Sequence, residues 1–183
     1  YGLDIAREGH LAVVDSRSCQ VQRIDKEGRV LARYGGPFYL TPGRHESSVK
    51  GFNNPRDIAV DKRGQVFVVD TGNNRVAVFS STGEPRFKFG AKGTRRGDFN
   101  SPVSVAVDDA NRVLVLDMLN FCVKIFGSGG EFRDSFGSRG TGDSEFDRPA
   151  RMAVDKEGNI YILDRGRVKI FRQDGQFFAA LSP

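Results

Sequence analysis

The chain has 183 residues, with 28 Lys and Arg against 23 Asp and Glu, and a formal net charge of +5. This length is sufficient for one sizeable hydrophobic core. No apolar run approaches the length of a membrane span, and no signal peptide opens the sequence. We therefore expect no association with a membrane. Because the first residues already read as part of a strand, we expect the chain to be a fragment of a longer protein.

Few side chains are suited to metal binding or redox chemistry. The chain has two cysteines, Cys19 and Cys122, and two histidines, His10 and His45. The cysteines fall in different repeats, so a disulfide between them is not expected. No Cys-x-x-Cys is present, and a zinc site would lack ligands. We predict no metal and no cofactor. Free thiols fit a reducing compartment, which predicts a cytoplasmic protein.

A block of sequence recurs at a fixed period. It begins at Pro55 as PRDIAVDKRGQVFVVDTGNNRVAVF and returns at Pro102 and Pro149, so that successive copies stand 47 residues apart. A weaker first copy, GLDIAREGHLAVVDSRSCQVQRI, lies at the N-terminus. Repeats of this length are supersecondary units that must stack on their neighbours to bury their apolar faces.

Each copy contains four short apolar runs separated by turn residues. The runs are rich in Val, Ile and Phe and are too short for helices, so we expect strands and almost no helix. The run VFVVD is apolar at successive positions, which indicates that both of its faces are buried. Four antiparallel strands covered on both faces describe a blade of a β-propeller.

A long polar loop that ends in Phe-x-x-Pro leads into each full copy. We interpret Phe52, Phe99 and Phe146 as plugs between blades, and the prolines as strand starts. The sequence thus predicts an all-β fold, a β-propeller with four visible four-stranded antiparallel blades that belong to a larger ring of about six. The chain is one propeller domain or fragment, with repeats at approximately 1–54, 55–101, 102–148 and 149–183.

The shared features Phe-x-x-Pro, Ala-Val-Asp, an Asp that closes the second run and a closing Phe-Gly resemble NHL repeats over essentially the whole chain. The style is most similar to the NHL domains of animal tripartite-motif (TRIM-NHL) and Brat-like proteins. This resemblance implies a module that binds RNA or protein in post-transcriptional regulation or in substrate recognition by a ubiquitin ligase. Any ligase activity would reside in a domain outside this chain. Fold alone does not choose between these functions.

Charge is distributed unequally between the two ends of the predicted blades. The loops between second and third strands, together with the loops between blades, carry all of the net positive charge. Such a surface attracts a polyanion. Arg dominates among its cations, and Arg binds phosphate bidentately and stacks on bases. Phe121 and Tyr39 are candidate stacking partners. The predicted RNA-binding residues are Arg56, Arg75, Lys92, Arg95, Arg96, Phe121, Arg139, Arg151, Arg165 and Arg167.

Single-stranded or hairpin RNA is therefore the predicted partner, bound by a non-catalytic module. The alternative is a protein-interaction module for substrate recognition by a TRIM-type ubiquitin ligase. An apolar patch around residues 38–40 would favour this alternative. Some related propellers are lyases or lactonases, and these rely on metal ligands. Such ligands are scarce in this chain, so we expect no small-molecule substrate and no enzyme activity.

The aspartates Asp15, Asp70, Asp117 and Asp164 occupy one position in each repeat. They are predicted to accept backbone N–H bonds in the loop that follows them, rather than to form a metal or catalytic ring. Asp61, Asp108 and Asp155 are predicted to start turns.

Overall fold

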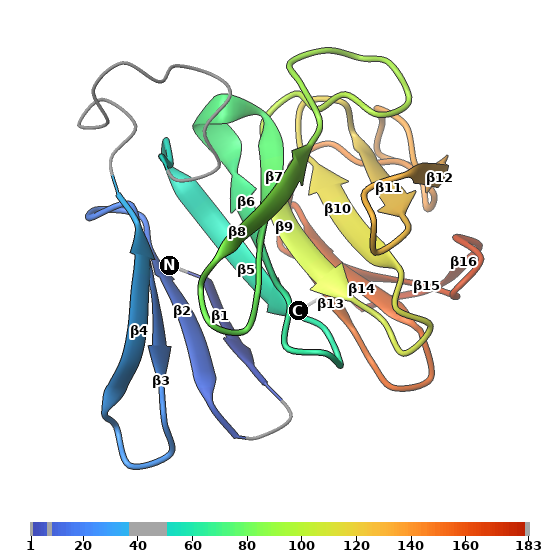
Figure 1. Cartoon of the computed structure of the whole chain (residues 1–183). Coiled ribbons are helices and arrows are strands. Elements are labelled where there is room, and N and C mark those ends of the chain that lie inside the picture. Colours follow the sequence, from blue (N-terminus) through green and yellow to red (C-terminus); the bar gives the residue numbers. More distant parts are fainter. Residues whose placement is uncertain (1, 7–8, 37–50, 182–183) are drawn as a thin grey trace. The chain divides into compact units, whose positions relative to one another are not determined.

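A computed structural model describes residues 2–6, 9–36 and 51–181 and shows an all-β protein (Figure 1). In these ranges the only helical element is the 3₁₀ turn η2 (Thr71–Asn73), so the prediction of almost no helix is confirmed. The first eight strands are β1 (Gly2–Ile5), β2 (Leu11–Asp15), β3 (Gln20–Ile24), β4 (Val30–Gly35), β5 (Pro55–Val60), β6 (Val66–Asp70), β7 (Arg75–Phe79) and β8 (Pro85–Phe89). The second eight are β9 (Pro102–Val107), β10 (Val113–Asp117), β11 (Cys122–Phe126), β12 (Phe132–Phe136), β13 (Pro149–Val154), β14 (Ile160–Asp164), β15 (Arg167–Phe171) and β16 (Phe177–Leu181). Within the described ranges no helix is long and apolar enough to cross a membrane.

The strands form four sheets, and each sheet contains the four strands of one sequence repeat in chain order. All neighbouring strands are antiparallel, as in β2 with β3 and in β10 with β11. These are the four-stranded blades of a β-propeller, as the repeat predicts. We call them blades 1 to 4.

The residues of each strand explain whether the strand is buried or partly exposed. In blade 2 every residue of β6, from Val66 to Asp70, is buried, as the unbroken apolar run predicts. The outer strand β8 instead alternates between partly buried and exposed residues. Aspartates stabilise the turns that connect the strands. Asp61 Oδ1 accepts hydrogen bonds from Arg63 N and Gln65 N, both at 2.8 Å. Asp108 and Asp155 accept equivalent bonds, so their prediction as turn starters is confirmed.

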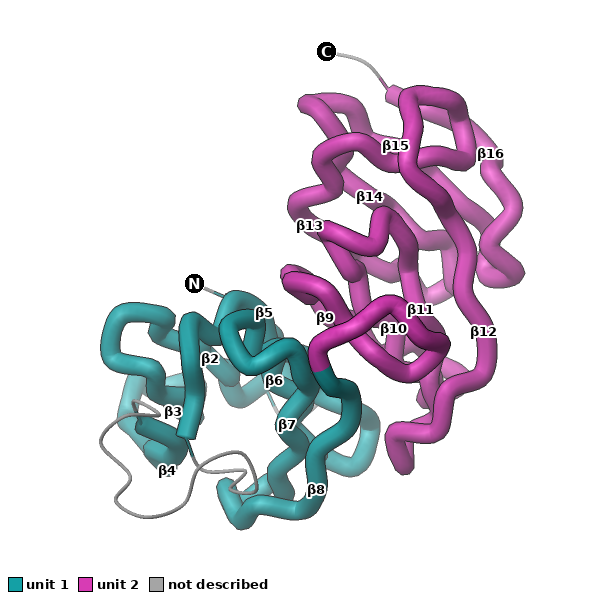
Figure 2. Tube along the Cα trace, turned by 90° about the horizontal axis from the view of Figure 1, so that it is seen from above, with its two compact units in different colours: residues 1–91 teal, residues 92–183 magenta. Residues whose placement is uncertain are grey.

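The chain divides into two compact units, residues 1–91 and 92–183, which are coloured separately in Figure 2. In unit 1, the inner strand β5 of blade 2 packs on β1 and β2 of blade 1. In unit 2, β13 of blade 4 packs on β9 and β10 of blade 3. Each pair of blades buries one core, centred on Val14, Phe52 and Val68 in unit 1 and on Leu116, Phe146 and Ile162 in unit 2.

A buried Phe precedes each full repeat, and Phe52 and Phe146 lie in the cores shared by two blades, which confirms their prediction as plugs between blades. Phe99 and Phe146 are completely buried and Phe52 is almost so. The Phe146 ring lies 5.6 Å from the Phe171 ring in an edge-to-face arrangement. It also covers Gly137, where φ is +93° and an added Cβ would lie 2.3 Å from the Phe146 ring.

Candidate nucleic-acid interface

Behind the predicted basic surface lies a buried ion pair in each of three blades. In blade 4, Lys169 Nζ lies 3.2 Å from Asp164 Oδ2. In blade 3, Lys124 Nζ lies 3.5 Å from Asp117 Oδ2. Burial raises the pKa of Asp117, and this shift is opposed by hydrogen bonds from Asn100 N and the Asn120 side chain and by the Lys124 charge.

Blade 2 builds the same pair from a different position, and this corrects one predicted RNA contact. Arg75 is buried; its Nε donates to Asp70 Oδ2 at 2.7 Å and its Nη2 to the Gly51 carbonyl at 2.6 Å. A guanidinium held in this way has its donors engaged and is not open to a phosphate. Arg75 is therefore a structural residue, and we leave it out of the candidate interface.

The buried lysines fix the loops that lead into blades 3 and 4. Lys124 Nζ donates to the carbonyls of Arg95 (3.0 Å) and Asp98, and Asn120 Nδ2 donates to the carbonyl of Gly93 (2.9 Å). The backbone of loop 91–101 is thus held from below while the side chains of Lys92, Arg95 and Arg96 remain exposed. Because Lys124 Nζ donates to the backbone carbonyls of this loop, the loop keeps its shape without using its own exposed cations, and these can contact a ligand.

Loop 137–148 repeats this construction in blade 4. Lys169 Nζ donates to the carbonyls of Gly142 (2.8 Å) and Glu145 (2.5 Å). A β-bridge between Arg139 and Phe146 closes the loop, as one between Lys92 and Phe99 closes the previous loop. Both loops therefore have a defined backbone.

Four predicted residues of unit 2 lie in or around this loop. The Arg139 guanidinium stacks over the Phe121 ring at 5.3 Å, which places a cation and an aromatic face side by side. Arg165 is half exposed and pairs with Asp147 at 3.3 Å. Arg167 is exposed and borders a depression. The lining of that depression comprises Thr141, Asp164, Arg165, Arg167 and Lys169.

The remaining predicted residues are placed less favourably. Arg151 is exposed on β13 and its Nη1 donates to the Val103 carbonyl at 3.3 Å. Arg56 is partly exposed on β5 in unit 1. Arg148 is exposed beside Pro149 and was omitted from the predicted set, although its charge was visible in the sequence. Tyr39 and the patch at residues 38–40 lie outside the described residues.

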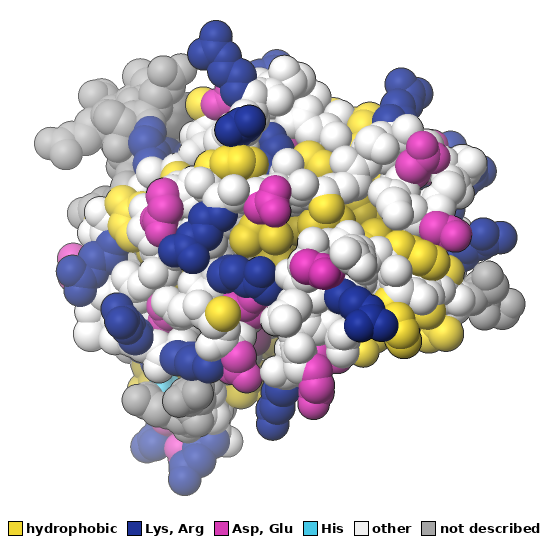
Figure 3. All heavy atoms as spheres, turned by 90° about the vertical axis from the view of Figure 1, so that its right-hand side faces the viewer, with side chains coloured by type: hydrophobic (Ala, Val, Ile, Leu, Met, Phe, Trp, Pro, Cys, Tyr) yellow, Lys and Arg dark blue, Asp and Glu magenta, His cyan; other side chains and the backbone are white. Residues whose placement is uncertain are grey.

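The structure thus brings one group of cations to one end of the blades in unit 2, which we call the loop surface. Antiparallel topology places the loops between blades and the β10–β11 and β14–β15 loops at that same end. The loop surface consists of Lys92, Arg95, Arg96, Phe121, Arg139, Arg148, Arg165 and Arg167. Acidic side chains occur in the same loops, and Figure 3 shows Asp and Glu interspersed among protruding Lys and Arg on the face it presents.

The aspartates repeated in each blade accept backbone N–H bonds as predicted, but for three of them the donor lies in a different loop from the one predicted. Asp15 accepts Arg17 N at 2.9 Å in the loop that follows it. Asp70, Asp117 and Asp164 instead accept backbone N–H bonds from the loop that precedes their blade. Each carboxylate therefore ties an inter-blade loop to its own sheet. Within the described ranges no group of three His, Cys, Asp or Glu could hold a metal ion, and both cysteines are free thiols.

Comparison with known families supports the propeller fold. The NHL repeat family model matches residues 52–79, and a family model described as a 6-bladed beta-propeller matches residues 100–179. A search of the curated proteins finds no match. The fold is a β-propeller, and the two matches support a propeller of NHL type. Neither of them specifies the tripartite-motif or Brat-like subgroup.

Solved structures share the fold at low sequence identity. A streptogramin B lyase has a TM-score of 0.71 at 10% identity over 98% of this chain and 53% of its own. Virginiamycin B lyase from Staphylococcus aureus has a TM-score of 0.69 at 13% identity over 100% of this chain and 55% of its own. Hydrazine synthase from Kuenenia stuttgartiensis has a TM-score of 0.71 at 12% identity over 98% of this chain and 48% of its own. The chain spans about half the length of these structures.

These structures correct the prediction that the chain is not an enzyme. Two of the similar propellers are lyases and a third is a synthase by name. The scarcity of metal ligands in the sequence is no ground for excluding catalysis, because enzymes are built on the same fold. At this level of identity the likeness shows the fold alone, so the fold gives no ground for excluding catalysis.

Proposed function

We propose that this propeller is a binding module whose loop surface in unit 2 binds single-stranded RNA. The observation that carries the proposal is the way loop 91–101 is built. Lys124 and Asn120 hold its backbone from the blade below, while Lys92, Arg95 and Arg96 extend outward. Cations on a fixed backbone lose less conformational entropy on binding than cations on a flexible loop.

The second loop supplies a different kind of contact. Arg139 already stacks on Phe121, so a base could add to the same stack while a phosphate meets the guanidinium edge. Arg148, Arg165 and Arg167 extend the positive charge along blade 4. Such a combination of exposed Arg and an aromatic face suits an unpaired strand better than a duplex, whose bases are stacked inside.

Salt dependence tests this proposal. We would measure the affinity of the chain for a fluorescent single-stranded RNA of random sequence by anisotropy over a series of KCl concentrations. If several phosphates are neutralised, the logarithm of the binding constant should fall with the logarithm of salt with a slope between about −2 and −5, at about −0.7 per phosphate.

A poly-glutamate peptide of matched charge separates RNA from an acidic protein surface. We expect RNA to bind at least about tenfold more tightly than the peptide at equal salt, because stacking and bidentate contacts add affinity beyond that of charge attraction. Equal affinity for both would overturn it and favour the protein-partner alternative.

A further inference from the structure

A second polar site lies in unit 1, at the opposite end of the blades from the loops between them. It is a cavity of about 280 Å³ between blades 1 and 2. Its walls come from Ala6 and His10 at the ends of β1 and β2, from the β5–β6 and β7–β8 turns, and from strands β3 and β4. Its lining includes Ala6, His10, Arg23, Asp61, Lys62 and Arg63.

Two of these residues depart from the repeat. The turn between the first two strands closes with the same backbone bond in every blade, from Ala6 N to the His10 carbonyl in blade 1 and from Asp108 N to the Arg112 carbonyl in blade 3. Blade 1 therefore has the small Ala6 where the other blades have Asp. In blade 3 the long Arg112 side chain reaches across to the Gln173 carbonyl of blade 4, whereas His10 is shorter. These replacements leave space in unit 1.

Arg23 departs from the repeat more strongly. It pairs with Ala12 in blade 1 at the register position where Ile125 pairs with Leu114 in blade 3. Ile125 belongs to the hydrophobic core of unit 2, and blade 2 has the buried Val78 at this position. Blade 1 thus directs a guanidinium where its neighbours direct an aliphatic side chain. Arg23 Nη2 lies 3.2 Å from His10 Nδ1 on the cavity wall.

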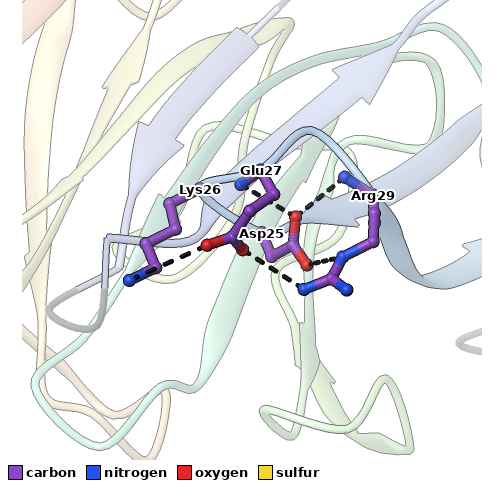
Figure 4. A network of polar contacts seen from close by, with 4 residues as sticks. All are labelled: Asp25, Lys26, Glu27 and Arg29. Carbon is purple, nitrogen blue, oxygen red and sulfur yellow. Dashed lines mark hydrogen bonds and ion pairs between the residues drawn. The ribbon is translucent and has the colours of Figure 1, made fainter.

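The fourth departure is an unsatisfied carboxylate oxygen. In the other turns of this type both oxygens are used: Asp25 Oδ2 accepts from Arg29 Nε at 2.7 Å (Figure 4), and Asp108 Oδ2 accepts from Arg112 Nε. Asp61 is only 4% exposed, and its Oδ2 has no hydrogen-bond partner among the described residues. A buried acceptor without a donor is costly, so this oxygen marks a place for a ligand donor.

We propose that this cavity binds a small hydroxylated organic anion, such as a sugar phosphate. A ligand hydroxyl would donate to Asp61 Oδ2, and the anionic group would lie against Arg23 and the basic β5–β6 turn, where Lys62 and Arg63 outnumber the single carboxylate. The cavity volume suits a molecule of about the size of a monosaccharide. This site does not include any residue of the loop surface. The proposal departs from the sequence-based expectation of no small-molecule substrate.

Amide NMR spectra of the chain titrated with glucose 6-phosphate test the proposal. Shifts should concentrate at Gly64, Thr82 and neighbouring amides of the cavity. Glucose and inorganic phosphate each carry half of the recognised chemistry, and each should bind at least about tenfold more weakly. Absence of localised shifts at millimolar glucose 6-phosphate would overturn the proposal. So would equal affinity for inorganic phosphate, because Asp61 would then take no part.

Two variants and two controls make the assignment specific. Arg23→Gln and Asp61→Asn should each lower affinity for glucose 6-phosphate at least about tenfold. Asn keeps the oxygen that the turn requires, and Arg23→Gln provides a second test if Asp61→Asn does not fold. Arg33→Gln removes the same charge from exposed β4, and Asp25→Asn changes a carboxylate whose oxygens are both paired; neither should alter affinity. Equal losses in variants and controls would refute the site. RNA binding should be unchanged in all four.

Discussion

Lys169 Nζ lies 3.2 Å from Asp164 Oδ2, with side chains that are 6% and 3% exposed. The same ammonium donates to two carbonyls of loop 137–148. Removing it would leave a buried carboxylate without its counter-charge and a loop without its anchor. We predict that Lys169→Met lowers the free energy of unfolding by about 3–5 kcal/mol, measured by urea denaturation.

Arg167→Met is the matched control, because Arg167 is two residues away but exposed. It should change stability by no more than about 0.5 kcal/mol. Equal effects of the two substitutions would show that the buried pair does not stabilise the blade.

A second prediction concerns the contact between Gly137 and Phe146. An alanine Cβ at Gly137 would lie 2.3 Å from the Phe146 ring, and the residue has φ of +93°. Gly137→Ala combines backbone strain with overpacking, so we expect a loss of about 2–4 kcal/mol of stability. Gly97→Ala, where a Cβ meets nothing within 4 Å, should stay within about 1 kcal/mol of the wild type. Equal melting temperatures of the two variants would contradict the tight packing of Phe146 on Gly137.

Most of the fold could be predicted from the sequence because the 47-residue period repeats the strand and turn pattern almost unchanged. The plugs followed from the same period, since Phe52, Phe99 and Phe146 are each buried as a repeated apolar residue should be. These features depend on local pattern and stacking, which one sequence records.

The site was harder to predict because equivalent positions have different roles. Arg75 and Arg167 both open a third strand, yet Arg75 is buried against Asp70 and Arg167 is exposed. The residue that distinguishes the blades lies two positions after the start of the third strand. Lys124 and Lys169 neutralise the aspartate in blades 3 and 4, whereas blade 2 has Ala77 there and must use Arg75 instead.

A third prediction concerns acid. The hydrogen bond from Arg29 N holds the pKa of Asp25 below its usual value, and the Asn159 side chain does the same for Asp155. A carboxyl with a depressed folded pKa stabilises the fold above its unfolded pKa, and this stabilisation is lost as the pH falls through the folded pKa. The contribution of these two carboxyls to the free energy of unfolding should therefore decrease below about pH 4.

Urea denaturation of the Asp25→Asn/Asp155→Asn chain at neutral pH and at about pH 3 checks this expectation. The double variant should lose less stability on acidification than the wild type, because it lacks two of the groups that must take up protons. An acid dependence identical to that of the wild type would show that other carboxyls dominate.

The central claim is that the loop surface binds RNA, and reversing Arg95 and Arg96 tests it most directly. Both side chains are exposed on a loop whose backbone Lys124 holds, so Arg95→Glu/Arg96→Glu should leave the circular dichroism spectrum unchanged. Arg33→Glu/Arg86→Glu makes the same charge change on exposed strands of unit 1 and serves as the control. We predict that the affinity of the Arg95/Arg96 variant for single-stranded RNA falls at least about tenfold, and that its salt slope is shallower by about 1.4, while the control keeps most of its affinity. A folded Arg95/Arg96 variant that binds RNA as tightly as the wild type would contradict the claim.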